Sequence, residues 1–438
     1  MQYGVFFVYL CEICKEHTSI LSNRASMRKL ICISLLCICS ITASATHTIS
    51  VLVSNPISSE RKDQPVVISL KPYGEVRSAL VTVNGQEIPC QLDDLDQDET
   101  FDELCFLADL NKKEQKRYTV TLYETGEPRS YPARVFTEMV LRNTSDKKLT
   151  KNNQNNFIES ITVRGDAADA YHIQHHHGVD FESELNGIRI YFDARQTLDL
   201  YGKYYQRLEL KDTQFYTNDE QKAQGYGDDV LWVGQTFGLG AFRGWDGQKP
   251  THIEPVRSRT QRIISYGPLR TIVELFDRGW QAPTTNAPRI PLNMTIRYTQ
   301  YAGHRDTDVD VFFNKDVSDY RFSTGVINVK GSEEFSDKKG LRACWGADYP
   351  AADTTKWKRE TVGLAVLVPQ KNIVSEEPAN KDNYAFVLQV NGKHMTYKVN
   401  YTSANETFGY HSAKEWFNYL KTWRREVEDP VIVKIDNP

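Results

Sequence analysis

Hydrophobic and polar residues alternate with a period of two along most of this chain. In the stretch 187–193 the apolar residues fall on one side, whereas an arginine, a tyrosine and an aspartate fall on the other. The stretches 269–275, 294–298, 308–313 and 361–368 follow the same period. Alternation of this kind is typical of β-strands, because successive side chains point to opposite faces. Many strands without intervening helices predict an all-β fold with a large antiparallel sandwich.

The N-terminal part of this β-rich region predicts a small sandwich of its own, over residues 46–140. Strand-like runs lie on both sides of Asn84-Gly85, a dipeptide typical of a tight hairpin turn. The polar stretch 144–156 has the composition of a linker. We therefore expect the larger, catalytic domain to span residues 157–438.

One helix is predicted near the C-terminus. Ser412 and Glu415 form a capping box. Trp416, Leu420 and Trp423 then recur at helical spacing. A short apolar stretch after the helix predicts a closing strand.

The beginning of the chain has the features of a targeting leader. A basic pair precedes the apolar run 30–39, and an Ala-Ser-Ala motif ends at Ala45. This order predicts a cleaved signal peptide over 27–45, since the apolar run is too short to span a bilayer comfortably; an uncleaved anchor is the alternative. Residues 1–26 are interpreted as a mis-called start before Met27. We expect a periplasmic or secreted protein that is free of the membrane after cleavage.

The charge and the cysteine content limit the classes of partner and the possible disulfide pairs. The net charge of the 438 residues is −4, which argues against nucleic acid as a partner. Most of the eight cysteines lie in the leader. An oxidising compartment would allow Cys90 and Cys105 to pair and would leave Cys344 as the odd cysteine.

An acidic stretch in the small domain has some features of a calcium-binding loop. Asp94, Asp96 and Asp98 occupy the first, third and fifth positions of such a loop. The sixth and twelfth positions, however, hold Glu99 and Cys105 instead of glycine and glutamate. Because these departures remove the turn and the bidentate ligand, a solvated acidic loop is the favoured interpretation.

The region richest in chemically capable side chains is 172–205, which begins with a histidine cluster. Arginine and lysine bind carboxylates, and tyrosine and histidine transfer protons, so this combination suits a cleft for a sugar acid. Rows exposed to water on a soluble sandwich are the alternative. The cluster includes His175 and His176, and two polar rows of strand period follow: Arg189, Tyr191 and Asp193, then Asp199, Tyr201 and Lys203.

A divalent metal is a second use for the histidine cluster. On a strand His175 and His177 would share a face. Asp180, Glu182 or Glu184 would complete the ligand set. The spacing matches no zinc signature, so we expect no cofactor. A cluster with only structural hydrogen bonds is a further alternative.

Four more residues are candidates for substrate binding. Trp232 lies in a glycine-rich segment and suits stacking on a sugar ring, although large aromatics are as often core residues. Arg257 belongs to a cationic stretch, His304 to a predicted turn, and His411 precedes the helix. A histidine there is biased toward its neutral form, although a plain flanking residue is equally consistent. The sequence contains no Gly-x-Ser-x-Gly, His-Glu-x-x-His or P-loop motif.

Several stretches resemble a known family of secreted proteins from polysaccharide-utilisation systems, catalogued as a domain of unknown function. They are His176–Glu182, Arg189–Asp193, Asp199–Lys203, His252–Arg257, Gly267–Glu274 and Tyr301–Arg305. The resemblance implies an oligosaccharide (uronyl) dehydratase of the kind used in ulvan breakdown. The last two stretches are also similar to the galactose-mutarotase-type β-supersandwich, which implies that architecture for the larger domain.

The activity implied by the resemblance is β-elimination between C4 and C5 of a terminal uronate, a carbon–oxygen lyase reaction. It needs a base at C5, an acid at the C4 oxygen and a cation beside the carboxylate. An oligosaccharide is the expected partner. The expected base and acid are among His175, His176 and Tyr191, and the expected cations are Arg189, Lys203 and Arg257.

Functions of other classes remain open. A glycoside hydrolase needs two carboxylates, for which Asp193, Asp199, Glu182 and Glu254 are candidates. A non-catalytic glycan-binding protein would use the aromatic residues and the polar rows alone. Mutarotase or epimerase activity is a minor alternative.

Overall fold

The structure, a computed structural model, describes residues 45–142, 156–165, 170–284, 290–351 and 353–436. The expected signal peptide and the mis-called start lie outside these residues, except for Ala45, which begins the first strand. In this part of the chain, no helix is long and apolar enough to cross a lipid bilayer.

A five-stranded and a three-stranded sheet form a small β-sandwich. Alternate residues of both sheets, such as Val51, Val66 and Val120, fill its apolar core. Asn84 and Gly85 both have positive φ (51° and 76°), which confirms the predicted hairpin turn. The strands are β1 (Ala45–Ser54), β2 (Arg61–Ser69), β3 (Ser78–Val83), β4 (Gln86–Ile88), β5 (Cys90–Asp93), β6 (Glu103–Leu110), β7 (Gln115–Tyr123) and β27 (Ile432–Asp436), in the orders β27-β1-β7-β3-β4 and β2-β6-β5.

A nine-stranded antiparallel sheet is the largest element of the larger sandwich. Its order is β21-β22-β23-β26-β19-β18-β17-β16-β9. The strands are β9 (Ser160–Arg164), β16 (Ser258–Tyr266), β17 (Arg270–Trp280), β18 (Leu292–Tyr301), β19 (Asp306–Phe313), β21 (Glu333–Ser336), β22 (Leu341–Asp348), β23 (Glu360–Leu367) and β26 (His394–Ser403).

Two five-stranded sheets share an apolar core with the nine-stranded sheet, to which Ile188, Leu275 and Phe386 each contribute from a different sheet. This arrangement confirms the predicted all-β fold, with a small N-terminal sandwich and a large antiparallel one. One sheet contains β8 (Val135–Glu138), β10 (Gly178–Ser183), β11 (Gly187–Tyr191), β12 (Leu198–Gly202) and β13 (Asp228–Asp229), and the other contains β14 (Arg243–Trp245), β15 (Pro250–Thr251), β20 (Phe322–Ile327), β24 (Ile373–Glu376) and β25 (Asn383–Leu388).

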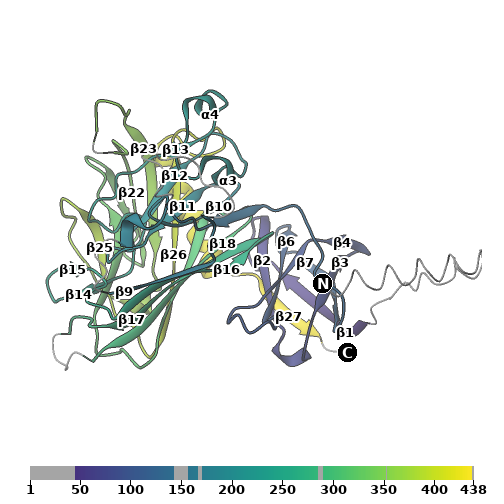
Figure 1. Cartoon of the computed structure of the whole chain (residues 1–438). Coiled ribbons are helices and arrows are strands. Elements are labelled where there is room, and N and C mark those ends of the chain that lie inside the picture. Colours follow the sequence, from purple (N-terminus) through teal and green to yellow (C-terminus); the bar gives the residue numbers. More distant parts are fainter. Residues whose placement is uncertain (1–44, 143–155, 166–169, 285–289, 352, 437–438) are drawn as a thin grey trace, which may run out of the picture. The chain divides into compact units, whose positions relative to one another are not determined.

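Two strands lie across the predicted domain division at 46–140 and 157–438. The C-terminal β27 pairs with β1, so both ends of the described chain meet in the small sandwich (Figure 1). Strand β8, which was assigned to the small domain, pairs with β10 in the larger one. The observed pairing therefore differs from the predicted boundaries, because strand partners are set by contacts that are remote in the sequence.

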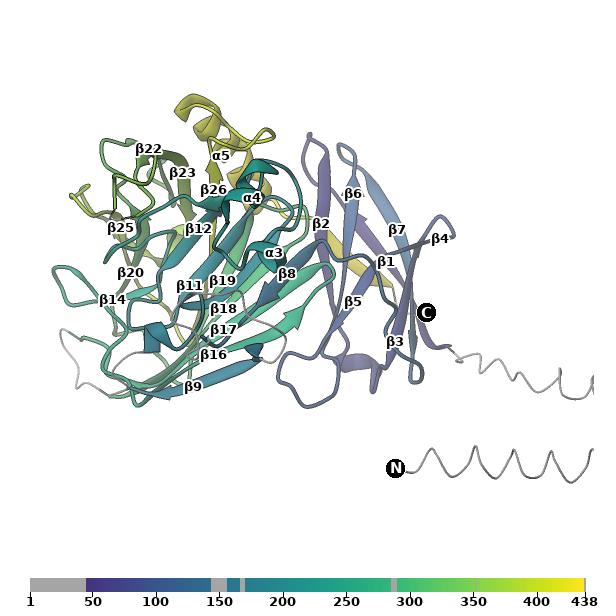
Figure 2. The ribbon, with the colours of Figure 1, turned by 45° about the horizontal axis from the view of Figure 1, so that its top comes forward.

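Helix α5 (Ala413–Glu428) confirms the predicted C-terminal helix. Ser412 accepts a hydrogen bond from the backbone of Glu415 and so caps its N-terminus. Trp416, Leu420 and Trp423 are buried against residues of β22 and β23. Figure 2 shows α5 beside these strands. The structure adds two short helices that the periodicity did not predict, α3 (Leu210–Thr213) and α4 (Asp219–Ala223), and the 3-10 turns η1 (Lys71–Tyr73), η3 (Ala170–His172) and η4 (Gln370–Asn372).

Cys90 and Cys105, which an oxidising compartment would allow to pair, form no disulfide in the structure. Cys90 lies opposite Phe106 on the neighbouring strand, whereas Cys105 lies opposite Gln91. Because side chains alternate along a strand, the two thiols point to opposite faces. All three described cysteines are buried and free, and burial raises the pKa of Cys90 to about 11.

Candidate functional site

A row of ionisable side chains crosses the sheet that contains β8 and β10–β13. Residues directly opposite each other on neighbouring strands share a face. The other face of this sheet carries apolar residues such as Ile188 into the core. The register places Glu138 opposite Asp180, Asp180 opposite Arg189, and Arg189 opposite Asp199.

This row is covered and not exposed to water, so the solvated alternative is wrong. Leu210 and Phe215, from the segment 203–227, pack against Tyr201 of β12. The guanidinium of Arg189 lies 4.2 Å from the centre of the Phe215 ring. Arg189 as a whole is only 4% exposed.

Arg189 binds two carboxylates and a phenol. Its Nη2 donates to Asp199 Oδ2 at 2.7 Å and to Asp229 Oδ2 at 2.9 Å. The Tyr191 hydroxyl donates to the same Asp199 oxygen at 2.5 Å and lies 3.3 Å from Arg189 Nη2. One cation therefore organises three oxygen-bearing groups at the centre of the sheet.

Burial sets the protonation states of these groups. It raises the pKa of the Asp229 carboxyl well above its usual range, and the charge of Asp199 adds to this shift while Arg189 opposes it. Burial also raises the pKa of the Tyr191 phenol, again against the effect of Arg189. Each shift disfavours the charged form. At neutral pH the phenol therefore keeps its proton, and Asp229 binds a proton more readily than an ordinary carboxyl does.

The histidine cluster lies in a turn beside this network, not on a strand. His177 has a left-handed backbone (φ 71°), and its ring stacks on Tyr171 with centroids 3.9 Å apart. Burial, with the charge of Arg189, lowers the pKa of His177 to about 3. Burial also lowers the pKa of His176, whose ring lies 5.8 Å from that of His175. The His176 and His177 rings are therefore neutral at neutral pH.

Arg195 and Asp193 form the rim at which the network meets solvent. Each side chain is 19% exposed, and the two form an ion pair of 2.5 Å. The Arg195 guanidinium lies 4.9 Å from the centre of the Tyr191 ring. It also donates to the Gly234 carbonyl at 3.1 Å. This contact joins the rim to the loop that carries Trp232, which is 53% exposed.

A cavity of about 260 Å³ adjoins the network at Asp229. Lys222 and Trp357 line it, with the ammonium 4.9 Å from the ring centre. Lys356 and Lys358 are exposed at its edge. Three carboxylates, Asp228, Asp229 and Glu360, line the same cavity, and Lys222 pairs with Asp228 at 2.7 Å. The lining thus combines both signs of charge with the apolar face of an indole.

The structure brings most of the predicted site residues into one neighbourhood. They come from β11, β12 and the turn before β10, which meet through strand pairing. Trp232 lies on the adjoining loop. The six that come together are His175, His176, Arg189, Tyr191, Asp193 and Asp199.

Lys203 was predicted to bind substrate, but the structure places it in a buried ion pair. Its ammonium donates to Glu182 Oε2 at 2.5 Å and to the carbonyls of Ser183 and Arg207, both at 2.7 Å. Its three protons are therefore used inside the protein. The strand period placed Lys203 on the correct face, but it did not reveal that Glu182 lies beside it.

Arg257, His304 and His411 also lie apart from the row. Arg257 directly precedes β16, in the nine-stranded sheet. His304 lies between β18 and β19, and its Nδ1 is 3.1 Å from Asp306 Oδ1. The His411 ring contacts the Ala404 carbonyl near the start of α5. These residues match the family stretches or a local pattern, but neither criterion specifies which side of a sandwich they occupy.

Several site residues were not predicted. Asp229 lies on a strand of only two residues, too short to give a periodic pattern. Tyr216 is not part of a periodic sequence pattern either, yet its hydroxyl lies 3.4 Å from Arg189 Nη1. Arg195 follows the polar row by two residues, so extension of that row past Asp193 would have identified it.

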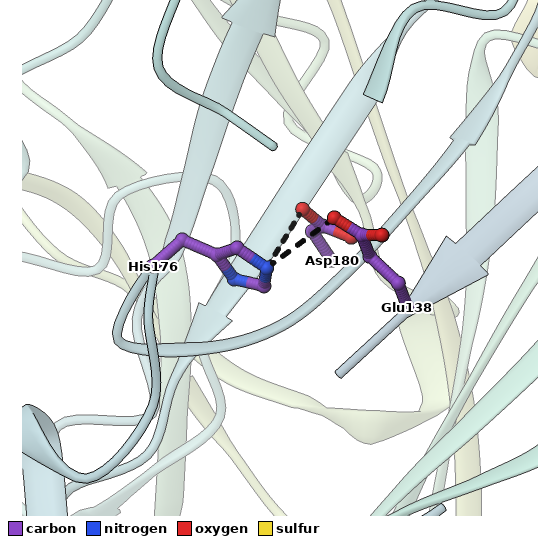
Figure 3. A group of neighbouring side chains, drawn as sticks. All are labelled: Glu138, His176 and Asp180. Carbon is purple, nitrogen blue, oxygen red and sulfur yellow. Dashed lines mark ion pairs between the residues drawn. The ribbon is translucent and has the colours of Figure 1, made fainter. Parts of the chain in front are cut away.

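A group suited to a metal ion lies at one end of the row. Glu138, His176 and Asp180 each offer a ligand atom, and these atoms lie within 4.8 Å of one another (Figure 3). The predicted metal set paired His175 with His177, which does not hold because the turn interrupts the strand alternation. The acidic stretch forms a turn in which Asp94 accepts the backbone N–H groups of Gln97 and Glu99.

Another cavity, of about 600 Å³, lies away from the row, between the two sandwiches and α5. Its lining includes His304, Asp306 and Lys398. Asp306 and Lys398 face each other at 3.2 Å, so charged groups in this lining already compensate one another.

Two solved structures are similar to this chain. An alpha-mannosidase from Enterococcus faecalis has 9% sequence identity and a TM-score of 0.46, over 90% of this chain and 47% of that chain. A protein in the glycosyl hydrolase family 38 from the same organism has 8% identity and a TM-score of 0.47, over 89% and 47%. The chain thus spans about half the length of these two proteins.

At the sequence level, no curated protein matches the chain. A family model described as a domain of unknown function (DUF4861) does match, over residues 53–433. This range includes most of the small sandwich and all of the large one. The chain therefore belongs to the DUF4861 family.

Proposed function

We propose that this protein is a periplasmic or secreted lyase that acts on oligosaccharides with a terminal uronate and eliminates the C4 substituent. The observation that carries the proposal is the position of the Tyr191 hydroxyl, 2.5 Å from Asp199 and 3.3 Å from Arg189. A protonated phenol beside a cation can protonate a leaving oxygen and is stabilised as a phenolate afterwards. The resemblance to oligosaccharide dehydratases supports the same reaction, with water as the leaving group.

The elimination needs one proton removed and one supplied. A base takes the proton from C5, and the electron pair of the broken C5–H bond forms the C4–C5 double bond. The C4–O bond breaks at the same time, and Tyr191 protonates the departing oxygen. Asp199 orients the phenol, and Arg189 offsets the charge of the phenolate. Return of the proton from the base to Tyr191 restores the resting enzyme.

Imidazoles are the groups best placed to act as the base. The His177 ring lies 6.3 Å from the Tyr191 ring, and the His175 ring lies 5.6 Å from the Tyr216 ring. His177 Nδ1 lies 3.0 Å from the Tyr171 carbonyl, which favours a proton on that nitrogen and leaves Nε2 as the acceptor. His176 is less suitable because its ring is fully buried between carboxylates.

Recognition of the uronate is assigned to the cavity next to Asp229. Lys356 and Lys358 offer exposed cations, and Trp357 offers a stacking face near the network. Lys222 and Arg195 are further cations, each paired with an aspartate and still partly exposed. A neutral oligosaccharide of the same size lacks the carboxylate that these groups would bind.

The proposal is tested by incubating the protein with a panel of uronate-ended oligosaccharides. A conjugated unsaturated uronate absorbs at about 230–240 nm, so we expect a steady rise in absorbance and a product lighter by one water. Matched oligosaccharides that end in a neutral sugar should give no signal. A flat absorbance trace with unchanged substrate masses across the panel would refute the proposal.

Glycoside hydrolysis is the second candidate, and one observation favours it. Asp199 and Asp229 both bind Arg189 Nη2, which holds the two carboxyls at or below the short end of the separation of about 5–10 Å that hydrolases use. The raised pKa of Asp229 suits an acid partner. Two of the other predicted carboxylates are engaged elsewhere, Asp193 with Arg195 and Glu182 with Lys203, and Glu254 is exposed beside His252. Release of reducing sugar without a rise in ultraviolet absorbance would favour hydrolysis over elimination.

A glycan-binding protein without turnover is the third candidate. It requires the cavity and the rim but no proton transfer. Binding of uronate-ended oligosaccharides at unchanged strength after Tyr191→Phe, with no product from the parent protein, would select it.

A further inference from the structure

Three side chains with metal-ligating atoms converge where β8, β10 and the histidine turn meet (Figure 3). Glu138 ends β8 and lies directly opposite Asp180 of β10. His176 precedes Asp180 by four residues. Its Nε2 lies 3.4 Å from Asp180 Oδ2 and 3.7 Å from Glu138 Oε1. Donor atoms that share one ion at about 2.1 Å are separated by about 3.0–3.5 Å, so a small closure would complete such a set.

The backbone before β10 is shaped to aim His176 at the carboxylates. His177 adopts a left-handed conformation, with φ of 71°. At Gly178 a Cβ atom would lie 1.7 Å from the Ile190 carbonyl oxygen, so only glycine fits there. This turn reverses the chain and brings His176 back over the strand that carries Asp180.

All three side chains are buried, and two of them, His176 and Asp180, have few partners among the described residues. His176 and Asp180 are fully buried, and Glu138 is 3% exposed. Among the described residues, no hydrogen bond of ordinary length reaches either Asp180 oxygen or either His176 ring nitrogen. The backbone of Glu138 interacts with Asp180 and that of Gly178 with His176, each as the last of the effects on that side chain. Buried charged groups normally have partners, so a bound ion would supply the partner that the Asp180 and His176 atoms lack.

The neighbouring cations do not supply that partner. Arg189 lies directly opposite Asp180 on β11, but its Nη2 donates to Asp199 and Asp229. Lys203 is bound to Glu182. Among the described residues, Asp180 is thus enclosed beside a neutral imidazole and pairs with neither of these two cations.

We propose that Glu138, His176 and Asp180 bind a divalent transition-metal ion, zinc or manganese. One imidazole and two carboxylates are ligands that both ions accept, whereas calcium and magnesium favour all-oxygen sets. The ion would tie β8 to β10 and fix the turn that holds His175 and His177. The inference goes beyond the proposed function and holds equally if the row catalyses hydrolysis or only binds glycans.

The test measures metal content and thermal stability of the chain. The protein is stripped with a chelator, incubated with Zn²⁺ alone or Mn²⁺ alone, and freed of unbound ion by gel filtration. We expect about one ion per chain by elemental analysis, and a melting temperature that falls with chelator and recovers with the ion, because a ligand of the native state stabilises it. Less than one tenth of an ion per chain for both metals, or identical melting curves with ion and with chelator, would overturn the proposal.

Variants assign the ion to these residues. Asp180→Asn and His176→Gln are each expected to weaken retention of the ion by roughly tenfold or more. The matched control is Asp96→Asn, which removes a carboxylate from the exposed acidic group of Asp94, Asp96 and Asp102 and should leave one ion bound. Equal loss in the control would place the ion elsewhere and refute the assignment. If a site variant fails to fold, the measurements on the parent chain still decide.

Discussion

Asp229 binds Arg189 at 2.9 Å although the strands that carry them, β13 and β11, are separated by β12. The long arginine side chain spans this distance on the covered face of the sheet. It thereby binds one carboxylate from β12 and one from β13. The guanidinium is thus both the electrostatic centre of the candidate site and a link between three strands.

Replacement of Arg189 should therefore damage stability as well as activity. In Arg189→Met the buried Asp199 loses its cation, and removal of one partner from a buried pair costs about 3–5 kcal/mol. We expect the free energy of unfolding to fall by that amount in urea denaturation at pH 7. Arg189→Lys keeps the charge but cannot make the same set of hydrogen bonds as a guanidinium. The free energy of unfolding of this variant should therefore lie between those of the parent and of Arg189→Met. Equal stability of all three proteins would contradict this account.

Tyr191→Phe separates chemistry from folding. The variant loses one hydrogen bond to Asp199, worth about 1 kcal/mol, and keeps the packing of the ring. If the phenol is the acid, kcat in the absorbance assay should fall about 100-fold or more, with little change in KM. The control is Tyr216→Phe, which removes a hydroxyl 3.4 Å from the same arginine but donates no proton in the proposed step. Comparable losses in both variants would indicate a merely structural role for Tyr191.

Local sequence features predicted much of the fold, but only part of the site. The period of two specified the strands, Asn84-Gly85 specified a hairpin, and the capping box at Ser412 specified α5, because each feature is encoded in adjacent residues. The same period gave the correct faces for Arg189 and Asp199.

Contacts that are remote in the sequence were out of reach. Glu138 joins Asp180 only because β8 pairs with β10, more than forty residues later in the chain. Lys203 lies on the predicted face, but its ammonium group is already bound to Glu182. The segment 203–227 covers the row and buries it. This segment has no periodic pattern of hydrophobic residues from which the cover could have been predicted. Strand order and packing of short helices, not side-chain type, therefore limited the prediction of the site.

The opposed thiols of Cys90 and Cys105 give a simple chemical test. A chain of residues 46–438, denatured without reductant and alkylated, should carry three adducts in its intact mass, one for each described cysteine. The same result is expected after prior reduction. A single adduct without reductant and three after it would reveal a disulfide and a different register between β5 and β6.

The buried pair of Lys203 and Glu182 predicts asymmetric effects. Lys203→Met leaves Glu182 buried without its cation and should destabilise the protein by about 3–5 kcal/mol in urea denaturation. Glu182→Gln added to Lys203→Met removes the isolated charge and retains an acceptor for the backbone of Glu209 and Leu210. The double variant should therefore recover part of the loss. No recovery would show that packing of the lysine stem, and not charge, determines the effect.

His304 predicts a pH dependence of stability outside the candidate site. Burial alone would lower the pKa of His304, but the hydrogen bond and charge of Asp306 outweigh it and raise the pKa above its ordinary value. Lys398 opposes this effect, and Glu426 lies near enough to interact with the ring. A group whose pKa is raised on folding stabilises the protein fully below its unfolded value of about 6.5, and this contribution is lost as the pH rises through the folded value.

The free energy of unfolding should accordingly contain a His304 contribution that is constant between about pH 5 and 6 and declines above about pH 6.5. His304→Asn should remove that decline and leave the two proteins closer in stability at pH 8 than at pH 5.5. Urea denaturation of both proteins across this range provides the measurement. His394→Asn is the matched control, because His394 is an exposed histidine whose ring also contacts an aspartate, Asp310, at 2.9 Å. A parent curve that rises from pH 6 to 8 while the His304→Asn curve stays flat would mean that the ring is held neutral in the folded protein, contrary to the raised pKa.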